Sequence, residues 1–353
     1  MSHHFSTKAI GVGFIALITG VVNGVAEERR SEPSAVFLSD KVYEKHAIER
    51  IAFGSCNKPK MDQGFWNVIR TKKPEIMLLL GDNHYAESTD PVRLKEAYDG
   101  LAAVPQYGAF RQQIPTFATW DNHDYGAKYP GRLHPHAEES EQLFLDHFAI
   151  PQTDVRRSRK GIYGTWIFGE KPHRVQVILL DLQRFRDPFQ EGTREEQFAP
   201  QPGKTLMGAE QWQWFEKELR KEAEVRFIGS GIQVLSNDHG WRRWGMFPNE
   251  RERLLRLIGE TKGTTVLLSG DRHRGEISVL DPASERPLCD LTSSSFNHCY
   301  PGEEPNSLRI GNLIHEAHFG WLEMDWEEGS IKMQLLSAES GDPLLTHTLK
   351  IRP

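Results

Sequence analysis

Four apolar runs in this chain each end in side chains of the kind that bind metal ions, and this pattern constrains the fold more than any other feature. One such run would carry little information, because strands often end in polar turns. In open α/β sheets, however, ligands collect beyond the carboxyl ends of the strands, so four such ends predict one shared site. The runs and the residues that follow them are Arg50–Phe53 with Gly54-Ser55-Cys56, Ile76–Leu80 with Gly81-Asp82-Asn83-His84-Tyr85, Pro115–Trp120 with Asp121-Asn122-His123-Asp124, and Val266–Ser269 with Gly270-Asp271-Arg272-His273.

The rest of the chain alternates apolar runs with amphipathic stretches, which is typical of an α/β domain. With 353 residues the chain is long enough for one large domain, expected over residues 49–353. Glycine-containing turns separate the last apolar runs, which predicts antiparallel strands at a sheet edge or in a second sheet. The predicted helices lie near residues 65–69, 143–148, 212–219 and 249–258, and the later predicted strands at 174–180, 225–235, 321–326, 331–336 and 344–349.

The first 26 residues are typical of an export signal. Lys8 precedes an apolar stretch of about 14 residues, Ala9–Val22, and Gly24-Val25-Ala26 resembles a signal-peptidase site. The stretch is shorter than the roughly 20 residues that span a bilayer, so a cleaved signal is favoured over an uncleaved membrane anchor. Residues 27–48 are polar and are expected to form a linker and a lead-in strand. The mature protein is therefore predicted to be exported, to the periplasm, the exterior or the cell surface, without a transmembrane segment.

Net charge and cysteine content narrow the classes of protein further. The net charge is −6 with acidic and basic residues interleaved, so no specific nucleic-acid-binding surface is indicated. Exported proteins can keep disulfides, and Cys289 and Cys299 either pair or stay free. Cys56 is then the odd cysteine, and metal ligation would explain an unpaired thiol in an oxidising compartment. The pattern gives no indication of the oligomeric state.

The first metal position is predicted to hold iron. Asp82 and Tyr85 are three residues apart after a strand, so both can reach one cation. Tyrosine and cysteine bind as anionic phenolate and thiolate, which suit a ferric ion better than Mg²⁺ or Ca²⁺. Cys56 and Tyr85 together therefore indicate Fe³⁺, with His273 as a neutral nitrogen ligand. Asp82 has two carboxylate oxygens and can bridge to a second metal.

The second metal position is predicted to use Asn122 together with Asp238 or His239, which follow another apolar run. Two metals about 3.5–4 Å apart form a clamp for in-line displacement at phosphorus, in which a metal-bound water loses its proton near neutral pH and attacks. The pattern thus predicts a metal-dependent hydrolase of phosphate esters.

The remaining polar residues at the strand ends are candidates for catalysis and substrate binding. His123 is predicted to bind a phosphate oxygen or to protonate the leaving group, and Asp124 to orient its imidazole. Asp271 is a further candidate catalytic residue, and Arg186 and Arg272 are candidate substrate-binding residues. Each residue alone has a structural explanation, as part of a turn, a buried small side chain or a loop hydrogen bond. Their shared position at strand ends favours the functional interpretation.

At these motifs the chain resembles the alkaline phosphatase D (PhoD-like) family of metallophosphatases, from about Ile48 to Ile331. Tyr85 stands three residues after the motif's aspartate, at the position that binds iron in the family, and purple acid phosphatases share this tyrosine. The matching segments are Phe53–Cys56, Leu80–Tyr85, Thr119–Gly126, Leu206–Leu219, Pro248–Leu255 and Leu268–His273.

The resemblance implies the fold of the calcineurin-like metallophosphoesterases, a four-layer αββα sandwich in which two mixed sheets are flanked by helices. It also implies hydrolysis of phosphate mono- or diesters with an iron ion and divalent partners, calcium in the best-known branch. The substrate would be a small phosphate ester, a lipid or a nucleotide. Two alternatives remain, a phospholipase D-like phosphodiesterase and a non-catalytic secreted binding protein on the same fold.

The chain departs from the family pattern near the second metal position. Asn122 stands where the family usually has aspartate, which keeps a ligand and removes a negative charge. Residues 244–247 read Trp-Gly-Met-Phe in place of Trp-Asp-Gly-Tyr, so a carboxylate thought to hold calcium is absent. Asn237–His239 are the candidate substitutes. Gln183 replaces the first arginine of a family motif at residues 181–186.

Overall fold

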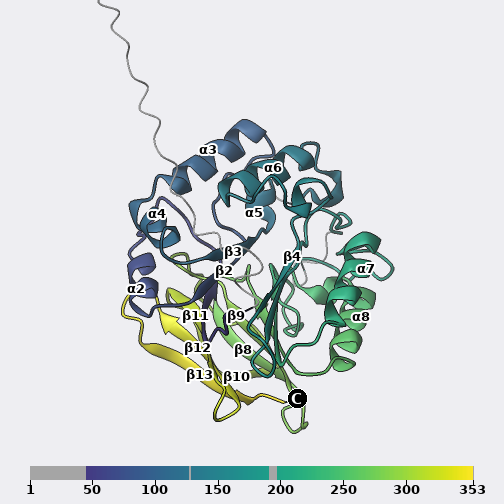
Figure 1. Ribbon diagram of the computed structural model, residues 1–353. Coiled ribbons are helices and arrows are strands. Elements are labelled where there is room, and N and C mark those ends of the chain that lie inside the picture. The colour runs from purple at the N-terminus through teal and green to yellow at the C-terminus, as the bar shows by residue number, and fades with distance from the viewer. Residues whose placement is uncertain (1–44, 127–128, 191–196, 353) are drawn as a thin grey trace, which may run out of the picture. The chain divides into compact units, whose positions relative to one another are not determined.

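Two β-sheets pack face to face in the computed structural model, which describes residues 45–352 except 127–128 and 191–196 (Figure 1). The predicted export signal, residues 1–26, and most of the predicted linker, residues 27–44, lie outside the described residues. The first sheet has six strands in the order β13-β12-β11-β1-β2-β3. The second sheet has seven strands in the order β10-β8-β9-β7-β6-β5-β4.

The elements have the following bounds. The first sheet contains β1 (Arg50–Gly54), β2 (Ile76–Leu80), β3 (Thr116–Thr119), β11 (His318–Asp325), β12 (Ser330–Ser337) and β13 (Pro343–Lys350). The second contains β4 (Gly164–Phe168), β5 (Val175–Leu179), β6 (Val225–Ser230), β7 (Thr264–Ser269), β8 (Gly275–Leu280), β9 (Leu288–Ser293) and β10 (Arg309–Ile314). The helices are α2 (Phe65–Thr71), α3 (Pro91–Ala102), α4 (Pro105–Arg111), α5 (Asn122–Tyr125), α6 (Ala137–His147), α7 (Gly208–Leu219) and α8 (Pro248–Gly259), with short 3-10 turns at Gly131–Leu133, Val155–Arg157 and Trp244–Met246.

Both sheets are mixed. In the first sheet β1, β2 and β3 run parallel, and β11, β12 and β13 extend it beyond β1 in antiparallel pairing. In the second sheet β5, β6, β7 and β9 run parallel, whereas β4, β8 and β10 pair antiparallel with their neighbours. The predicted antiparallel strands near the carboxyl terminus are confirmed, and they form the edge of the first sheet.

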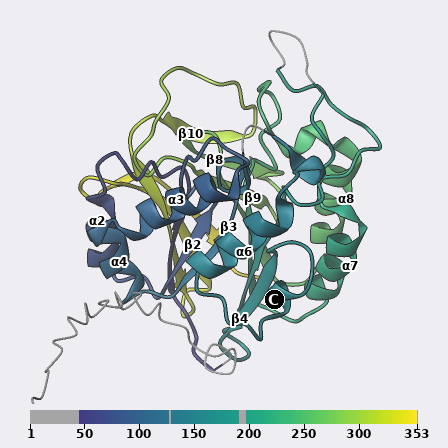
Figure 2. The same cartoon turned by 90° about the horizontal axis from the view of Figure 1, so that it is seen from above.

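Side chains of the central strands alternate between two apolar layers. On β2, Ile76, Leu78 and Leu80 face the interior between the sheets, whereas Met77 and Leu79 pack against helices. Burial on both faces is typical of parallel strands that are covered by helices. Helices α2, α3, α4 and α6 cover the first sheet, and α7 and α8 cover the second (Figure 2). The four layers confirm the predicted αββα sandwich.

Strand β6 is shorter than predicted. It ends at Ser230, whereas the sequence predicts a strand over residues 225–235. Beyond this point Val234 and Leu235 donate their backbone N–H groups to Asp290 Oδ2 of β9, at 3.0 and 2.9 Å. Because a side chain replaces a neighbouring strand as the acceptor, residues 231–243 form a loop. This loop stays at the carboxyl end of β6 and brings Arg242 toward the strand ends.

The described cysteines are all free thiols. Cys289 lies in the core between the sheets, and Cys299 Sγ accepts a hydrogen bond from Ser295 Oγ at 2.9 Å. The two cysteines whose pairing the sequence left open therefore do not form a disulfide. Among the described helices, none combines the length and the apolar character that crossing a membrane requires.

Candidate metal centre

Two groups of potential metal ligands lie among the described residues, at the carboxyl ends of β1, β2 and β7 and just beyond β3. In each group the ligand atoms are within 4.8 Å of one another. The first ligand group contains Cys56, Asp82 and His273, and the second contains Asp82, Asp121 and Asp271. Asp82, predicted as a bridging ligand, belongs to both groups.

The backbone of these residues is strained. Cys56, Asp82, Asp271 and His273 have positive φ angles of 62°, 51°, 73° and 54°. The left-handed conformation costs a residue other than glycine about 1–2 kcal/mol. Each of these residues lies within a few positions of a strand end, where the positive φ angle turns the chain and directs the side chain toward the others. Strain of this kind persists only where surrounding contacts hold it, and it clusters at functional sites.

Tyr85 completes the first ligand group. Its hydroxyl lies 3.5 Å from Asp82 Oδ2 and 3.4 Å from His273 Nε2. Cys56 Sγ lies 3.7 Å from the same carboxylate oxygen. A thiol, a carboxylate, a phenol and an imidazole therefore face one common point.

Residues outside the first ligand group orient it. His273 Nδ1 lies 2.6 Å from the carbonyl oxygen of His298, which leaves Nε2 to bind a metal. Ser294, just beyond β9, accepts the backbone N–H of His273 at 2.8 Å, and its Oγ lies 3.3 Å from Cys56 Sγ. One serine thus ties together ligands that come from the two different sheets.

Burial makes the charged forms of these side chains unfavourable without a partner ion. Burial raises the pKa of the Cys56 thiol and of the Tyr85 phenol well above their usual values. It raises the pKa of Asp82 to about 6 and lowers the pKa of His273 to about 3. A metal ion reverses this preference, because it binds thiolate, phenolate, carboxylate and neutral imidazole. The donors of the first ligand group therefore fit a metal ion.

Arg242 places a positive charge in the second ligand group. Its guanidinium donates to both carboxylate oxygens of Asp121, at 3.0 and 2.7 Å, and forms an ion pair with Asp271. Gln183 Nε2 also donates to Asp121 Oδ1, at 2.6 Å. A divalent ion bound by these carboxylates would compete with a buried cation, so the second group fits a metal ion less well than the first.

Asn122 begins α5 beside the second ligand group, and its Oδ1 is buried without a hydrogen-bond partner. Asp124 accepts the backbone N–H groups of Asn83 at 2.8 Å and of Asp121 at 3.0 Å, which fixes the turn that presents Asn122. Both carboxylate oxygens of Asp124 accept hydrogen bonds in this turn, and the carboxylate beside the His123 imidazole is that of Glu87, so the orienting role of Asp124 stays a prediction.

His123 lies at the mouth of the first ligand group. Its ring centroid is 4.2 Å from that of Tyr85, and its backbone N–H donates to Asp82 Oδ1 at 3.3 Å. The side chain is 21% exposed, so one edge of the imidazole is accessible. Its Nδ1 lies 2.8 Å from Glu87 Oε1. Glu87, which no sequence motif indicated, is therefore the carboxylate that lies beside this ring.

Lys58 and His298 form a further polar pair at the same mouth. Lys58 Nζ lies 3.1 Å from His298 Nε2 and 5.1 Å from the centroid of the Tyr85 ring. The His298 ring is 4.4 Å from that of His273. No sequence motif indicated either residue. Lys58 stands two residues after Cys56, so its position in the sequence could have indicated it. His298 lies in an irregular loop with no recognisable sequence pattern.

The structure does not bring Asp238 or His239 into either group of potential ligands within the part of the chain that it describes. Asp238 is exposed and accepts the backbone N–H of Ser307 at 2.5 Å. His239 is buried, its Nδ1 accepts the backbone N–H of Trp241 at 3.2 Å, and burial and nearby arginines lower its pKa. The role of one of them at the second metal position stays a prediction, and Arg242 of the same loop is the residue that reaches the carboxylates.

The two arginines predicted to bind substrate are both held by protein partners. Arg186 is fully buried and donates to Asp187 O at 2.9 Å and to Gln183 Oε1 at 3.3 Å, and its contact with substrate stays a prediction. Arg272 is 7% exposed, lies 3.6 Å from Asp271 and is paired with Glu304.

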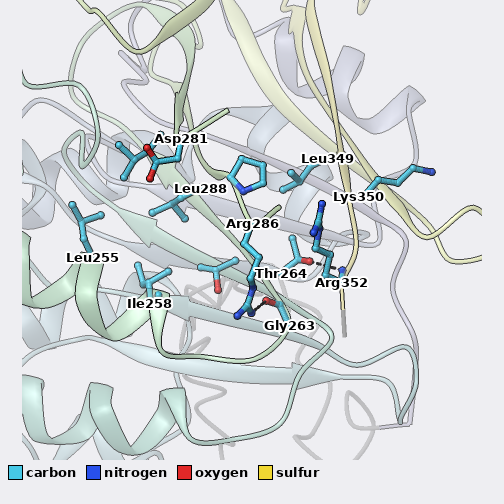
Figure 3. Close-up of a pocket in the computed structure, with 14 residues that line it drawn as sticks. Leu255, Ile258, Gly263, Thr264, Asp281, Arg286, Leu288, Leu349, Lys350 and Arg352 are labelled. Carbon is cyan, nitrogen blue, oxygen red and sulfur yellow. Dashed lines mark hydrogen bonds between the residues drawn. The ribbon is translucent and has the colours of Figure 1, made fainter. Parts of the chain in front are cut away.

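A pocket of about 210 Å³ lies away from these groups (Figure 3). It is lined by Leu255 and Ile258 of α8 and by Thr264 at the amino end of β7, whereas Asp271 and His273 follow the carboxyl end of that strand. Arg286, at its wall, donates to the carbonyl oxygens of Thr261 at 2.8 Å and Gly263 at 3.1 Å. The pocket is therefore separate from the candidate metal centre.

Comparison with known proteins agrees with this fold. The sequence matches the PhoD-like phosphatase family over residues 51–337, and no curated protein matches it. The chain is similar to the structure of PhoD, with a TM-score of 0.71 and 16% identity over 88% of this chain and 71% of that one. It is also similar to purple acid phosphatase PPD1 from yellow lupin (Lupinus luteus), with a TM-score of 0.62 and 12% identity over 87% of this chain and 54% of that one.

A third similar structure is GAP50, the anchor in the inner membrane complex of Plasmodium. Its TM-score is 0.56, with 13% identity over 87% of this chain and 90% of that one. At such low identities these likenesses show the fold, and the family match over most of the chain shows the class of enzyme. The protein is a metal-dependent phosphoesterase, and its chain belongs to the PhoD-like phosphatase family.

Proposed function

We propose that the protein is an exported hydrolase of phosphate mono- or diesters that uses ferric iron. The observation that carries the proposal is the first ligand group, in which Cys56 and Tyr85 offer a thiol and a phenol beside Asp82. Thiolate and phenolate favour a ferric ion, whereas Mg²⁺ and Ca²⁺ take carboxylate, carbonyl and water oxygens. His273 supplies the nitrogen ligand.

The residues at the mouth are proposed to act on the substrate. A metal ion in the first ligand group would polarise a phosphate oxygen and lower the pKa of a water. Because Glu87 lies on the Nδ1 side of His123, Nε2 is the nitrogen that meets a phosphate oxygen or protonates the leaving group. Lys58 adds a positive charge beside it. Asp271 and Arg272 are proposed to act beside the metal through their charges.

The sequence also predicts a second metal ion, a divalent one such as calcium. The unpartnered Asn122 Oδ1 beside Asp82 supports such an ion, whereas the contacts of Arg242 with Asp121 and Asp271 oppose it. The number of metal ions per chain decides between these two arrangements.

The substrate is proposed to be a small phosphate ester, a nucleotide or a lipid headgroup. The neighbouring reaction is that of a phospholipase D-like phosphodiesterase, and a comparison of mono- and diester substrates separates the two. Export is proposed on the sequence of residues 1–26 alone.

A second candidate function is a non-catalytic binding protein. GAP50 has a similar fold and is an anchor in a membrane complex, so this fold also serves in assembly. The four candidate ligands of the first group are all present in this chain and face one another, which favours catalysis.

Metal analysis combined with a panel of phosphate esters tests the proposal. The purified protein is expected to contain iron, to absorb visible light and to release nitrophenol from nitrophenyl phosphates. Asp82→Asn and His123→Ala are each expected to lower turnover by about 10²–10⁴-fold, while Asp99→Asn, at an exposed carboxylate of α3, is the control and leaves it unchanged. Full activity of colourless, iron-free protein would contradict the iron assignment, and full activity of Asp82→Asn would contradict the site.

A further inference from the structure

Arg242 is a buried cation at the strand ends that pairs with carboxylates. It is 4% exposed and donates two hydrogen bonds to Asp121, in the bidentate geometry that makes arginine–carboxylate pairs strong. The same guanidinium contacts Asp271. Two of the three carboxylates of the second ligand group therefore share a counter-charge that the chain itself supplies.

The second ligand group needs such a charge. Its carboxylate oxygens lie within 4.8 Å of one another, and all three residues are buried. Two or three ionised carboxylates at this distance repel one another unless a cation lies between them.

The fold holds Arg242 in place by contacts outside the carboxylates. Its guanidinium carbon lies 5.1 Å from the centroid of the Tyr129 ring. The loop that carries it is fixed at its start by the Asp290 contacts of Val234 and Leu235, and by a β-bridge between Gln233 and Arg243, its neighbour in sequence. The side chain is thus directed into the carboxylates by the loop.

We infer that Arg242 takes the place of the second metal ion. The inference rests on the proposed function, because it assumes a metal ion in the first ligand group. With Asp121 and Asp271 bound to Arg242, Asp82 and Asn122 are the candidate ligands among the described residues that remain for a second ion. A Ca²⁺ ion takes 6–8 oxygens, so these two side chains would leave most of its coordination to carbonyls and water. The protein therefore binds one metal ion per chain and uses a guanidinium as the second positive charge beside the phosphate.

The test counts metal ions and does not depend on turnover. Iron-loaded full-length protein is titrated with Mn²⁺ and with Ca²⁺, with binding measured by calorimetry and by the electron paramagnetic resonance of Mn²⁺. Wild-type protein is expected to bind one iron and no stoichiometric second ion. Arg242→Met removes the charge and keeps most of the volume, so it is expected to gain one divalent ion per chain. Adding Asp271→Asn to that variant is expected to abolish the gained site.

Arg243→Met is the matched control, because this neighbouring arginine is equally buried but donates to Asn237 Oδ1 and Trp241 O. It is expected to bind metals as the wild type does. A stoichiometric second ion in wild-type protein that Asp271→Asn removes would overturn the inference, even if Arg242→Met fails to fold. Absence of iron and of its visible absorption would instead contradict the proposed function, so the two failures are distinguishable.

Discussion

Replacing Gly81 with alanine tests how tightly the backbone is packed at the metal centre. Gly81 has φ +103°, and an added Cβ would lie 2.5 Å from Asp121 N and 2.8 Å from Trp120 C, both backbone atoms. The left-handed conformation costs alanine about 1–2 kcal/mol, and the overlap adds about 1–3 kcal/mol. The expected loss of stability is therefore roughly 2–5 kcal/mol.

Gly203→Ala is the matched control for this substitution. Gly203 has a similar φ of +80°, but an added Cβ would meet no atom within 4 Å. Only the conformational cost remains, about 1–2 kcal/mol. At roughly 2 °C per kcal/mol for a large domain, Gly81→Ala is expected to lower the Tm by about 4–10 °C and Gly203→Ala by about 2–4 °C.

The assay is thermal unfolding of both variants, together with their iron content. Gly81 lies between β2 and Asp82 and touches Asp121, so the displaced backbone is expected to lower iron occupancy in Gly81→Ala only. Equal Tm values and equal iron contents for the two variants would show that the overlap of the added Cβ at Gly81 with the backbone of Trp120 and Asp121 has no effect.

Two further predictions concern ionisable groups. The metal-free protein is expected to lose stability as the pH rises from 3.8 to about 6. Burial raises the pKa of Asp82 and Asp121 to about 6, so the folded state binds protons more tightly than the unfolded chain does. Denaturant unfolding at several pH values measures this, and rising stability in that window would contradict it. Glu87→Gln is expected to move the alkaline limb of the pH–rate profile to lower pH. Burial lowers the pKa of His123, and Glu87 is the largest influence that raises this pKa. Glu96→Gln, at an exposed site on α3, is the control, and an unchanged alkaline limb in Glu87→Gln would show that Glu87 does not affect this histidine.

The sequence predicts those parts of the site that depend on local order along the chain. Cys56, Asp82 and Tyr85 lie in the turns that follow buried strands. An apolar run that stops at polar residues marks the end of such a strand in the sequence itself. These strand ends need no knowledge of distant contacts, whereas the stacking of two sheets was expected from the resemblance to the PhoD-like family.

The remaining parts depend on contacts between segments that are far apart in sequence. The end of β6 at Ser230 is set by the side chain of Asp290, and the position of Arg242 by the loop that follows. Glu87 lies beside His123, whereas the carboxylate of Asp124 accepts backbone hydrogen bonds in its own turn. No periodicity or spacing in the sequence encodes these contacts.

The pairing of β1 with β11 has a consequence for the order of assembly. Arg50 pairs with Glu323, so the strand that carries Cys56 acquires its outer neighbour only when nearly the whole chain is available. Contacts of such wide sequence separation form slowly. His273 also comes from the other sheet, after β7. A nascent or truncated chain that lacks these segments has no complete ligand set. Binding of the metal ion is therefore expected to be among the last steps of maturation and to report that both sheets have closed.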